Sequence, residues 1–225
     1  MAGRRCRQGR LIAMSPRKTA ISNVYAVVVA AVAWSGLLLQ YWLILWSGTL
    51  VYATVRYFSF FTILSNLLVA MVATSAATGG DWAPLRFWRR PRVRGLAALS
   101  IAVTCLIYAT VLAGQWHPQG PQLVADRTVH YVVPFLYLFW WVALLPHGSL
   151  RWRDALHWLL FPLVFLVWTL LRGAVVHEYP YPFLDVDTLG YARVLIDSLG
   201  VGVVFVVLGL GLVTLDRAMA KHIDT

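Results

Sequence analysis

The chain of 225 residues is 60% hydrophobic, only 12% charged, and carries a formal net charge of +10. A soluble domain of this length could not cover so much apolar surface, so the composition indicates a membrane protein. The basic residues cluster between apolar runs, and the 11 Trp lie mostly near the ends of those runs. This pattern is typical of membrane interfaces, so we predict no nucleic-acid partner.

Six apolar segments are long enough to cross a bilayer as helices, since one span needs about 20 residues. They comprise 21–46, 57–77, 95–116, 128–146, 154–172 and 194–215. We therefore predict an all-α, polytopic bundle of six transmembrane helices over 21–217. A basic N-terminal tail (1–20) precedes it and a short tail (218–225) follows it. Met14, followed by Ser-Pro-Arg-Lys, is an alternative translation start to Met1.

The basic residues between these segments fall predominantly on one side of the predicted bundle. Fifteen of the 19 Lys and Arg lie in the N-terminal tail, in the links after the second and fourth segments, and in the C-terminal tail. The other four are Arg56, Arg127, Arg172 and Arg193. Because short basic loops stay in the cytoplasm, this asymmetry predicts a multi-pass protein of the cell (inner or plasma) membrane with both termini cytoplasmic.

Polar residues interrupt three of the apolar segments at one predicted depth. Thr62 and Asn66 lie one helical turn apart on a shared face, and Ser59 extends that face. His130 near the start of the fourth segment and Asp197 near the start of the sixth also fall in the outer half of the bilayer. Polar groups in hydrocarbon need partners, so we interpret this convergence as a candidate functional site.

A carboxylate precedes the histidine by one helical turn. Asp126 and His130 share a face if the helix extends to Asp126. A carboxylate that holds one imidazole nitrogen leaves the other free as a base. Pro134, on the same face, loosens the backbone hydrogen bonding of this helix. The candidate counter-charges for Asp197 lie at outer helix ends: Arg56, Arg172 and Arg193.

Each of these residues also has a purely structural interpretation. A threonine in a membrane helix often bonds the carbonyl four residues before it, and an asparagine often joins two helices. His130 could reach the headgroups, and Asp197 could form a structural ion pair. The outer link 173–193, which contains Tyr179-Pro180-Tyr181-Pro182, is either a lid over the site or an ordinary interfacial loop.

No cofactor and no metal site are predicted. His130 and His157 lie near opposite membrane faces, which argues against a haem held between them. The possible metal ligands on the outer side lack a typical short spacing; they are His117, His130, His177, Asp126 and Glu178. The sequence contains no glycine-rich phosphate loop and no Gly-x-Ser-x-Gly turn.

Three segments together resemble one family of membrane proteins. They are the block 56–66, the segment Val129-His130-Tyr131-Val132-Val133-Pro134, and the loop Tyr179-Pro180-Tyr181-Pro182-Phe183-Leu184. Over nearly all of 20–217 the chain resembles the bacterial six-helix branch of the androgen-induced integral membrane protein family. Animal members of that family are threonine hydrolases of fatty acid esters of hydroxy fatty acids. The resemblance implies that Thr62 is the nucleophile and His130 its general base.

The leading hypothesis is therefore an intramembrane lipid-ester hydrolase with its site in the outer leaflet and a membrane lipid or lipid-like substrate. Thr62 and His130 would be catalytic, because a threonine hydroxyl is a weak nucleophile that needs an adjacent base. Asp126 or Asp197 would orient the base or balance its charge. The supporting oxyanion donors would be Arg56, Asn66 or backbone amides.

Two other functions are compatible with the same residues. The first is a small transporter or ligand-binding membrane protein, in which Asp197 and Arg172 matter more than Thr62. The second is a structural partner subunit, in which the polar cluster only joins helices. The sequence identifies no protein partner and no oligomeric state.

Overall fold

The structure, a computed structural model, describes residues 15–79, 82–115 and 117–221, and all its regular elements are helices. The prediction of an all-α chain is confirmed. Two of the short elements, η2 and η3, are π-helical turns. The elements are α1 (Pro16–Ile44), η1 (Leu45–Ser47), α2 (Leu50–Phe58), α3 (Phe61–Thr78), α4 (Ala83–Trp88), α5 (Pro91–Ile107), η2 (Tyr108–Leu112), α6 (Gly120–Arg127), η3 (Thr128–Val132), α7 (Val133–Leu144), α8 (Trp152–His157), α9 (Leu160–Val176), η4 (Pro182–Leu184) and α10 (Val186–Lys221).

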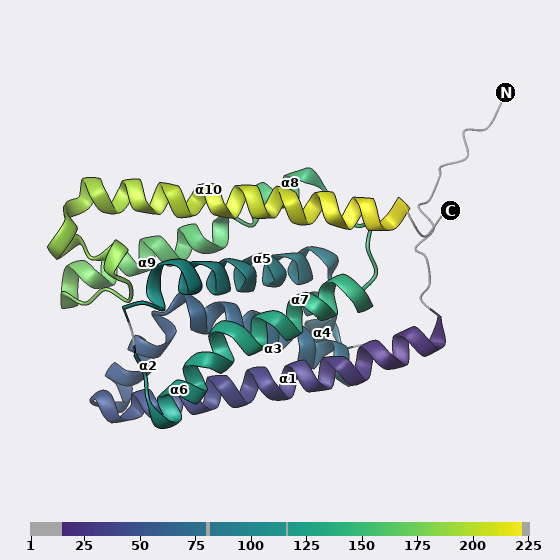
Figure 1. Cartoon of the computed structure of the whole chain (residues 1–225), viewed down its shortest axis with the longest axis horizontal. Coiled ribbons are helices and arrows are strands. Elements are labelled where there is room, and N and C mark those ends of the chain that lie inside the picture. Colours follow the sequence, from purple (N-terminus) through teal and green to yellow (C-terminus); the bar gives the residue numbers. More distant parts are fainter. Residues whose placement is uncertain (1–14, 80–81, 116, 222–225) are drawn as a thin grey trace.

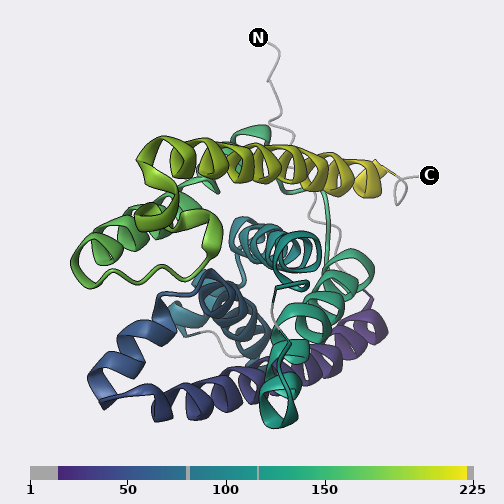
Figure 2. The ribbon, with the colours of Figure 1, turned by 60° about the vertical axis from the view of Figure 1, so that its left-hand side comes forward.

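The long helices run side by side along the long axis of the molecule, and α2 and α6 lie at the end opposite the start of α1 (Figure 1). Helix α3 packs against α1 and α5, and α5 occupies the middle of the bundle when it is viewed towards that end (Figure 2). In the most apolar part of α3, 56% of the residues are buried, against 17% in α10. The outer helices thus expose apolar side chains, as expected where lipid is the solvent.

Five helical stretches among the described residues are long and apolar enough to cross a membrane: Pro16–Ser47, Phe61–Thr78, Pro91–Leu112, Trp152–Val176 and Val186–Ala220. The predicted segment 128–146 lies in the helix that α6, η3 and α7 form together, which is not among the five. Polar residues in its first half lower the hydropathy of that helix. The chain is a helical bundle of the membrane type, and six spans remain a prediction.

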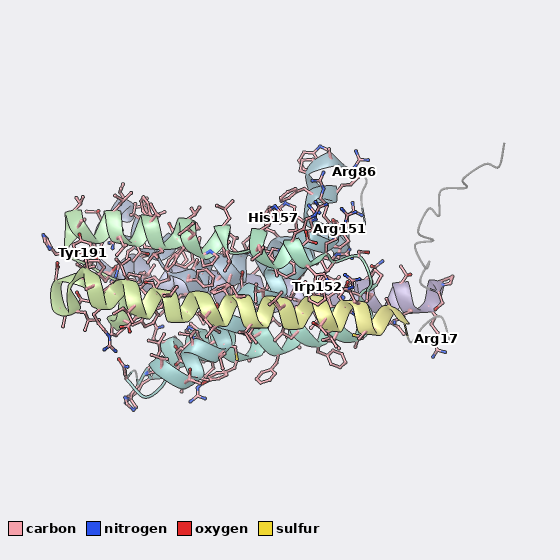
Figure 3. The ribbon with its side chains drawn as sticks, turned by 90° about the horizontal axis from the view of Figure 1, so that it is seen from above. Arg17, Arg86, Arg151, Trp152, His157 and Tyr191 are labelled. Atoms are coloured by element: carbon pink, nitrogen blue, oxygen red, sulfur yellow. The ribbon has the colours of Figure 1, made fainter. Side chains whose placement is uncertain are left out.

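Basic residues from three of the predicted cytoplasmic segments lie towards one end of the bundle (Figure 3). The labelled side chains of Arg17, Arg86 and Arg151 lie towards the end where α1 begins and α10 finishes, whereas Tyr191 lies at the opposite end (Figure 3). Basic residues gathered at one end are what the positive-inside rule requires of a membrane protein. The arrangement is therefore compatible with the predicted cytoplasmic position of both termini.

The second predicted span is not one continuous helix. Segment 57–77 contains the break between α2 and α3, where the backbone of Phe60 is extended. The hydroxyl of Ser59 bonds to its own helix at 2.7 Å and accepts the indole N–H of Trp168 at 3.0 Å. Ser59 therefore does not share a helical face with Thr62, and that part of the predicted polar stripe is wrong. The apolar aromatic residues here are compatible with either conformation, so hydrophobicity could not reveal the break.

Helices extend into both of the predicted tails. Helix α1 already begins at Pro16, because the Ser15 side chain accepts the backbone N–H of Lys18 and a proline is favourable at the first helical position. At the other end, α10 continues to Lys221. Met14 lies outside the described residues.

Candidate active site

The side chains of Thr62 and His130 meet between α3 and η3. Thr62 is the second residue of α3 and is buried, and its Oγ1 lies 3.2 Å from Nε2 of His130. The hydroxyls of Thr54, Thr110 and Thr214 instead bond the carbonyl four residues earlier, at 2.7 to 2.8 Å. The residue four positions before Thr62 is Phe58, which ends α2 on the other side of the break at Phe60. The position of Thr62 thus leaves its hydroxyl free for His130.

Asp126 contacts the second ring nitrogen of His130, Nδ1. Nδ1 of His130 lies 3.0 Å from the backbone oxygen of Asp126 and 3.2 Å from its carboxylate Oδ1. Both oxygens can only accept, which assigns the hydrogen to Nδ1 and directs the lone pair of Nε2 to the hydroxyl of Thr62. The prediction that Asp126 and His130 share a face is confirmed. The three side chains have the connectivity of a nucleophile, a base and an orienting carboxylate.

Tyr108 completes this network, and no sequence pattern indicated it. Its ring stacks on the imidazole of His130, with centroids 3.7 Å apart and planes at 12°. Its hydroxyl donates to Oδ2 of Asp126 at 2.5 Å, so both carboxylate oxygens of this buried residue have partners. Tyr108 and His130 both lie in π-helical turns, which are rare and frequent at functional sites.

Pro134 ends the π-helical pattern that contains His130. In η3 the backbone hydrogen bond joins an N–H to the carbonyl five residues earlier. The next bond of this kind would join residue 134 to the Val129 carbonyl, but Pro134 has no N–H. The Val129 carbonyl instead accepts Nδ2 of Asn66 at 3.0 Å, and the same Nδ2 donates to the Thr62 carbonyl at 2.8 Å. Asn66 thus joins α3 to η3 and positions Thr62 opposite His130. These contacts agree with the structural interpretation of Asn66, in which an asparagine joins two helices.

A tyrosine of the outer link also contacts Thr62. The hydroxyl of Tyr181 accepts the backbone N–H of Thr62 at 3.2 Å and lies 3.4 Å from its Oγ1. The ring of Tyr181 stacks on that of Phe183, with centroids 5.4 Å apart. Burial raises the pKa of Tyr181, so this hydroxyl keeps its proton at neutral pH. The sequence indicated the segment but not this residue.

Arg172 ties the same link to the bundle. Its guanidinium donates to the carboxylate of Glu178 at 2.8 Å and to its carbonyl at 3.1 Å. The hydroxyl of Tyr52 on α2 donates to the same carboxylate. These bonds, first that of Tyr52 and then that of Arg172, lower the pKa of Glu178, so the carboxylate is charged at neutral pH. The link 177–185 is thus anchored over the start of α3.

Two cavities meet at Thr62. The first, of about 310 Å³, lies between α3, α5, α9 and α10 and is lined mainly by aliphatic and aromatic side chains. The second, of about 830 Å³, lies between α1, α2, α6 and the outer link and contains Arg56, Arg172 and His130. We call them the apolar cavity and the polar cavity. The residues that line both are Thr62, Tyr108, Leu112 and Tyr181.

The structure does not bring Asp197 to the other predicted site residues. Its carboxylate bonds to Nε of Arg193, one turn earlier on α10, at 3.0 and 3.1 Å. Asp197 lines neither cavity, and Arg193, rather than Arg56 or Arg172, is its counter-charge. Asp197 therefore lies away from the site, although its predicted depth in the membrane is similar to that of Thr62 and His130. The orientation of α10 about its own axis decides this, and the sequence does not define that orientation.

No group of three or more His, Cys, Asp or Glu side chains within the described ranges is placed to hold a metal ion. No family model, curated protein or solved structure matches this chain. The site is therefore defined by its own geometry: a Thr–His–Asp arrangement in a helical bundle of the membrane type, between an apolar and a polar cavity.

Proposed function

We propose that this chain is an intramembrane hydrolase of lipid esters, with Thr62 as the nucleophile and His130 as its general base. The observation that carries the proposal is the 3.2 Å contact between Thr62 Oγ1 and Nε2 of His130. Asp126 holds the opposite ring nitrogen. A threonine hydroxyl becomes an effective nucleophile only beside such a base.

The reaction would proceed in two halves. Thr62 Oγ1 attacks the ester carbonyl carbon while its proton passes to Nε2 of His130. The tetrahedral intermediate expels the alcohol, which takes the proton back from the imidazolium and leaves the acyl group on Thr62. A water molecule then attacks this acyl group and gives a proton to His130. The bond between the acyl carbon and Thr62 Oγ1 breaks, Oγ1 takes that proton back from the imidazolium, and the acid leaves. The Asp126 carboxylate stabilises the imidazolium in both halves.

Two donors beside Thr62 would stabilise the oxyanion of the intermediate. The backbone N–H of Thr62 lies in the first turn of α3, where the helix dipole favours negative charge. The hydroxyl of Tyr181 bonds to that N–H in the free protein. A substrate carbonyl oxygen placed between them would accept from both groups. Asn66, an earlier candidate, donates to two backbone carbonyls instead.

The surroundings of the site favour a lipid substrate. Apolar side chains of α9 and α10 cover the outside of the bundle, and the apolar cavity next to Thr62 lies beside these helices. A lipid could therefore approach laterally from the outer leaflet, since the positive-inside rule predicts that this end of the bundle faces outward. The resemblance to the androgen-induced family supports the same roles for Thr62 and His130. The transporter hypothesis has less support, because Asp197 lines neither cavity.

The proposal is tested with a fluorophosphonate probe, which labels activated hydroxyl nucleophiles covalently. We expect the purified protein in lipid vesicles to be labelled, with the adduct on Thr62 by peptide mass spectrometry. Thr62→Ala should not be labelled. Thr214→Ala is the matched control, because that residue is exposed and its hydroxyl bonds to the Leu210 carbonyl of its own helix. Equal labelling of Thr62→Ala and the wild type would overturn the assignment.

The outer link offers a second test through Gly173, which lies under the ring of Tyr179. A Cβ at Gly173 would lie 2.0 Å from that ring, so Gly173→Ala must displace the ring and with it the link that carries Tyr181. Misplacement by about 1 Å can cost up to about 100-fold in rate, so we expect a loss of ester hydrolysis of that order. Gly211→Ala, where a Cβ meets open space, is the control. Equal hydrolysis rates for the two variants would show that the position of the link is immaterial.

A further inference from the structure

The apolar and polar cavities share one wall, and the proposed nucleophile is part of it. Thr62, Tyr108 and Tyr181 each line both cavities. Any molecule whose reacting carbon contacts Thr62 Oγ1 can therefore extend into two spaces of different chemistry. An ester has two such halves, joined at the carbon that the nucleophile attacks.

Beyond this wall, two described side chains with a hydroxyl line the apolar cavity, Thr104 and Ser198, and that of Ser198 has no partner among the described residues. The Thr104 hydroxyl is engaged with the Ser100 carbonyl at 3.0 Å and with the Ser65 hydroxyl at 2.8 Å. Phe61, Phe165 and Phe205 form an aromatic cluster along one side, with centroids 5.3 and 5.7 Å from that of Phe61. A polar group placed beside this cluster would lose its hydration without compensation.

The polar cavity differs because charged and amide side chains lie among the apolar residues that line it. Amide side chains from α1 and α6 line it, with Gln122 donating to Gln40 at 2.9 Å. The guanidinium groups of Arg56 and Arg172 and the carboxylates of Asp126, Glu178 and Asp185 add charges of both signs. Hydroxyl groups of a ligand would find donors and acceptors here, and a long alkyl chain would displace water from charged groups.

We propose that the substrate is an ester of one aliphatic acyl chain with a polar alcohol, whose acyl chain lies in the apolar cavity and whose alcohol lies in the polar cavity. This inference rests on the proposed function, because Thr62 is the point at which the two halves separate. The bond that breaks joins the acyl carbon to the alcohol oxygen. The polar alcohol then leaves into the polar cavity, and the acyl chain stays on Thr62 in the apolar cavity until water releases it.

Gly202 on α10 provides a direct test, because it lines the apolar cavity and a Cβ there meets open space. Gly202→Leu should fill the cavity without disturbing the helix. Monoacylglycerols with acyl chains of increasing length are the probe, and released fatty acid is measured for protein in lipid vesicles. We expect kcat/KM for the longest chains to fall by at least about tenfold, while the shortest chains are unaffected.

Two further variants make the result decisive. Gly200→Leu is the matched control, since a Cβ there also meets open space but Gly200 lines neither cavity. Ser198→Leu is a second filling variant, because its hydroxyl is buried without a partner among the described residues and also borders the apolar cavity. We expect Ser198→Leu to shift the chain-length profile and Gly200→Leu to leave it unchanged.

The possible failures can be told apart. If hydrolysis depends on Thr62 but both filling variants keep the wild-type profile, the cavity assignment is overturned and the proposed function stands. If they change the profile for acetate esters of long-chain alcohols rather than for monoacylglycerols, the assignment of the two halves is reversed and the inference is again overturned. If Thr62→Ala hydrolyses all of these esters at the wild-type rate, the proposed function itself fails.

Discussion

Thr62→Ala is expected to hydrolyse lipid esters at least about 10³-fold more slowly than the wild type, because removing the nucleophile of a catalytic triad costs that much or more. The variant should keep its fold. Among the described residues the Thr62 hydroxyl bonds only to His130 and Tyr181, whereas its carbonyl, which accepts from Asn66, remains. The measurement is kcat/KM for protein in vesicles, together with thermal unfolding in detergent.

Two substitutions at the same position separate chemistry from packing. Thr62→Ser keeps the hydroxyl in reach of His130 and should retain most of the activity. Thr62→Val keeps the shape of the side chain without the hydroxyl and should be as inactive as Thr62→Ala. Activity in Thr62→Val equal to that of the wild type would mean that another group attacks the ester.

His130→Gln is expected to lower kcat/KM by about 10²- to 10⁴-fold, the usual contribution of a general base. A glutamine side chain is polar and can fill part of the space but cannot take the proton of Thr62 at neutral pH. His157→Gln is the matched control, because that imidazole is exposed and, within the described part of the chain, bonds only to the carbonyl of Arg153 in its own helix.

The double variant gives the sharper result. If Thr62 and His130 act as one unit, Thr62→Ala with His130→Gln should be no slower than Thr62→Ala alone, because the base has nothing left to activate. Fully additive losses would show that the two side chains contribute independently. Full activity in His130→Gln would remove this histidine from the mechanism.

Much of the candidate site was predictable from the residues themselves. The four-residue spacing of Asp126 and His130 places them on one helical face, and the spacing of Thr62 and Asn66 does the same. Pro134 predicted a disturbed backbone next to His130, and the structure has a π-helical turn there. These are local consequences of helix geometry, so they need no knowledge of which helices are neighbours.

The residues that sequence reasoning missed or misplaced depend on how separate elements meet. Tyr108 reaches His130 because the π-helical turn η2 packs against the π-helical turn η3. No proline in η2 indicates from the sequence that such a turn forms there. Tyr181 reaches Thr62 only because the outer link folds back, held by Arg172 through Glu178. Asp197 shares the predicted depth of the site, yet α10 is rotated so that this carboxylate meets Arg193 instead.

The sequence by itself determined the class of the protein. Long apolar segments and clustered basic residues require a helical bundle of the membrane type, because backbone groups in hydrocarbon must be bonded within their own helix. Only the tertiary structure decided that the hydroxyl of Thr62 contacts His130 and that an apolar and a polar cavity meet there. The position of a residue along an apolar segment predicts how deep it lies in the membrane. The rotation of each helix and the fold of each link follow from side-chain packing between segments far apart in the chain, which no local pattern contains.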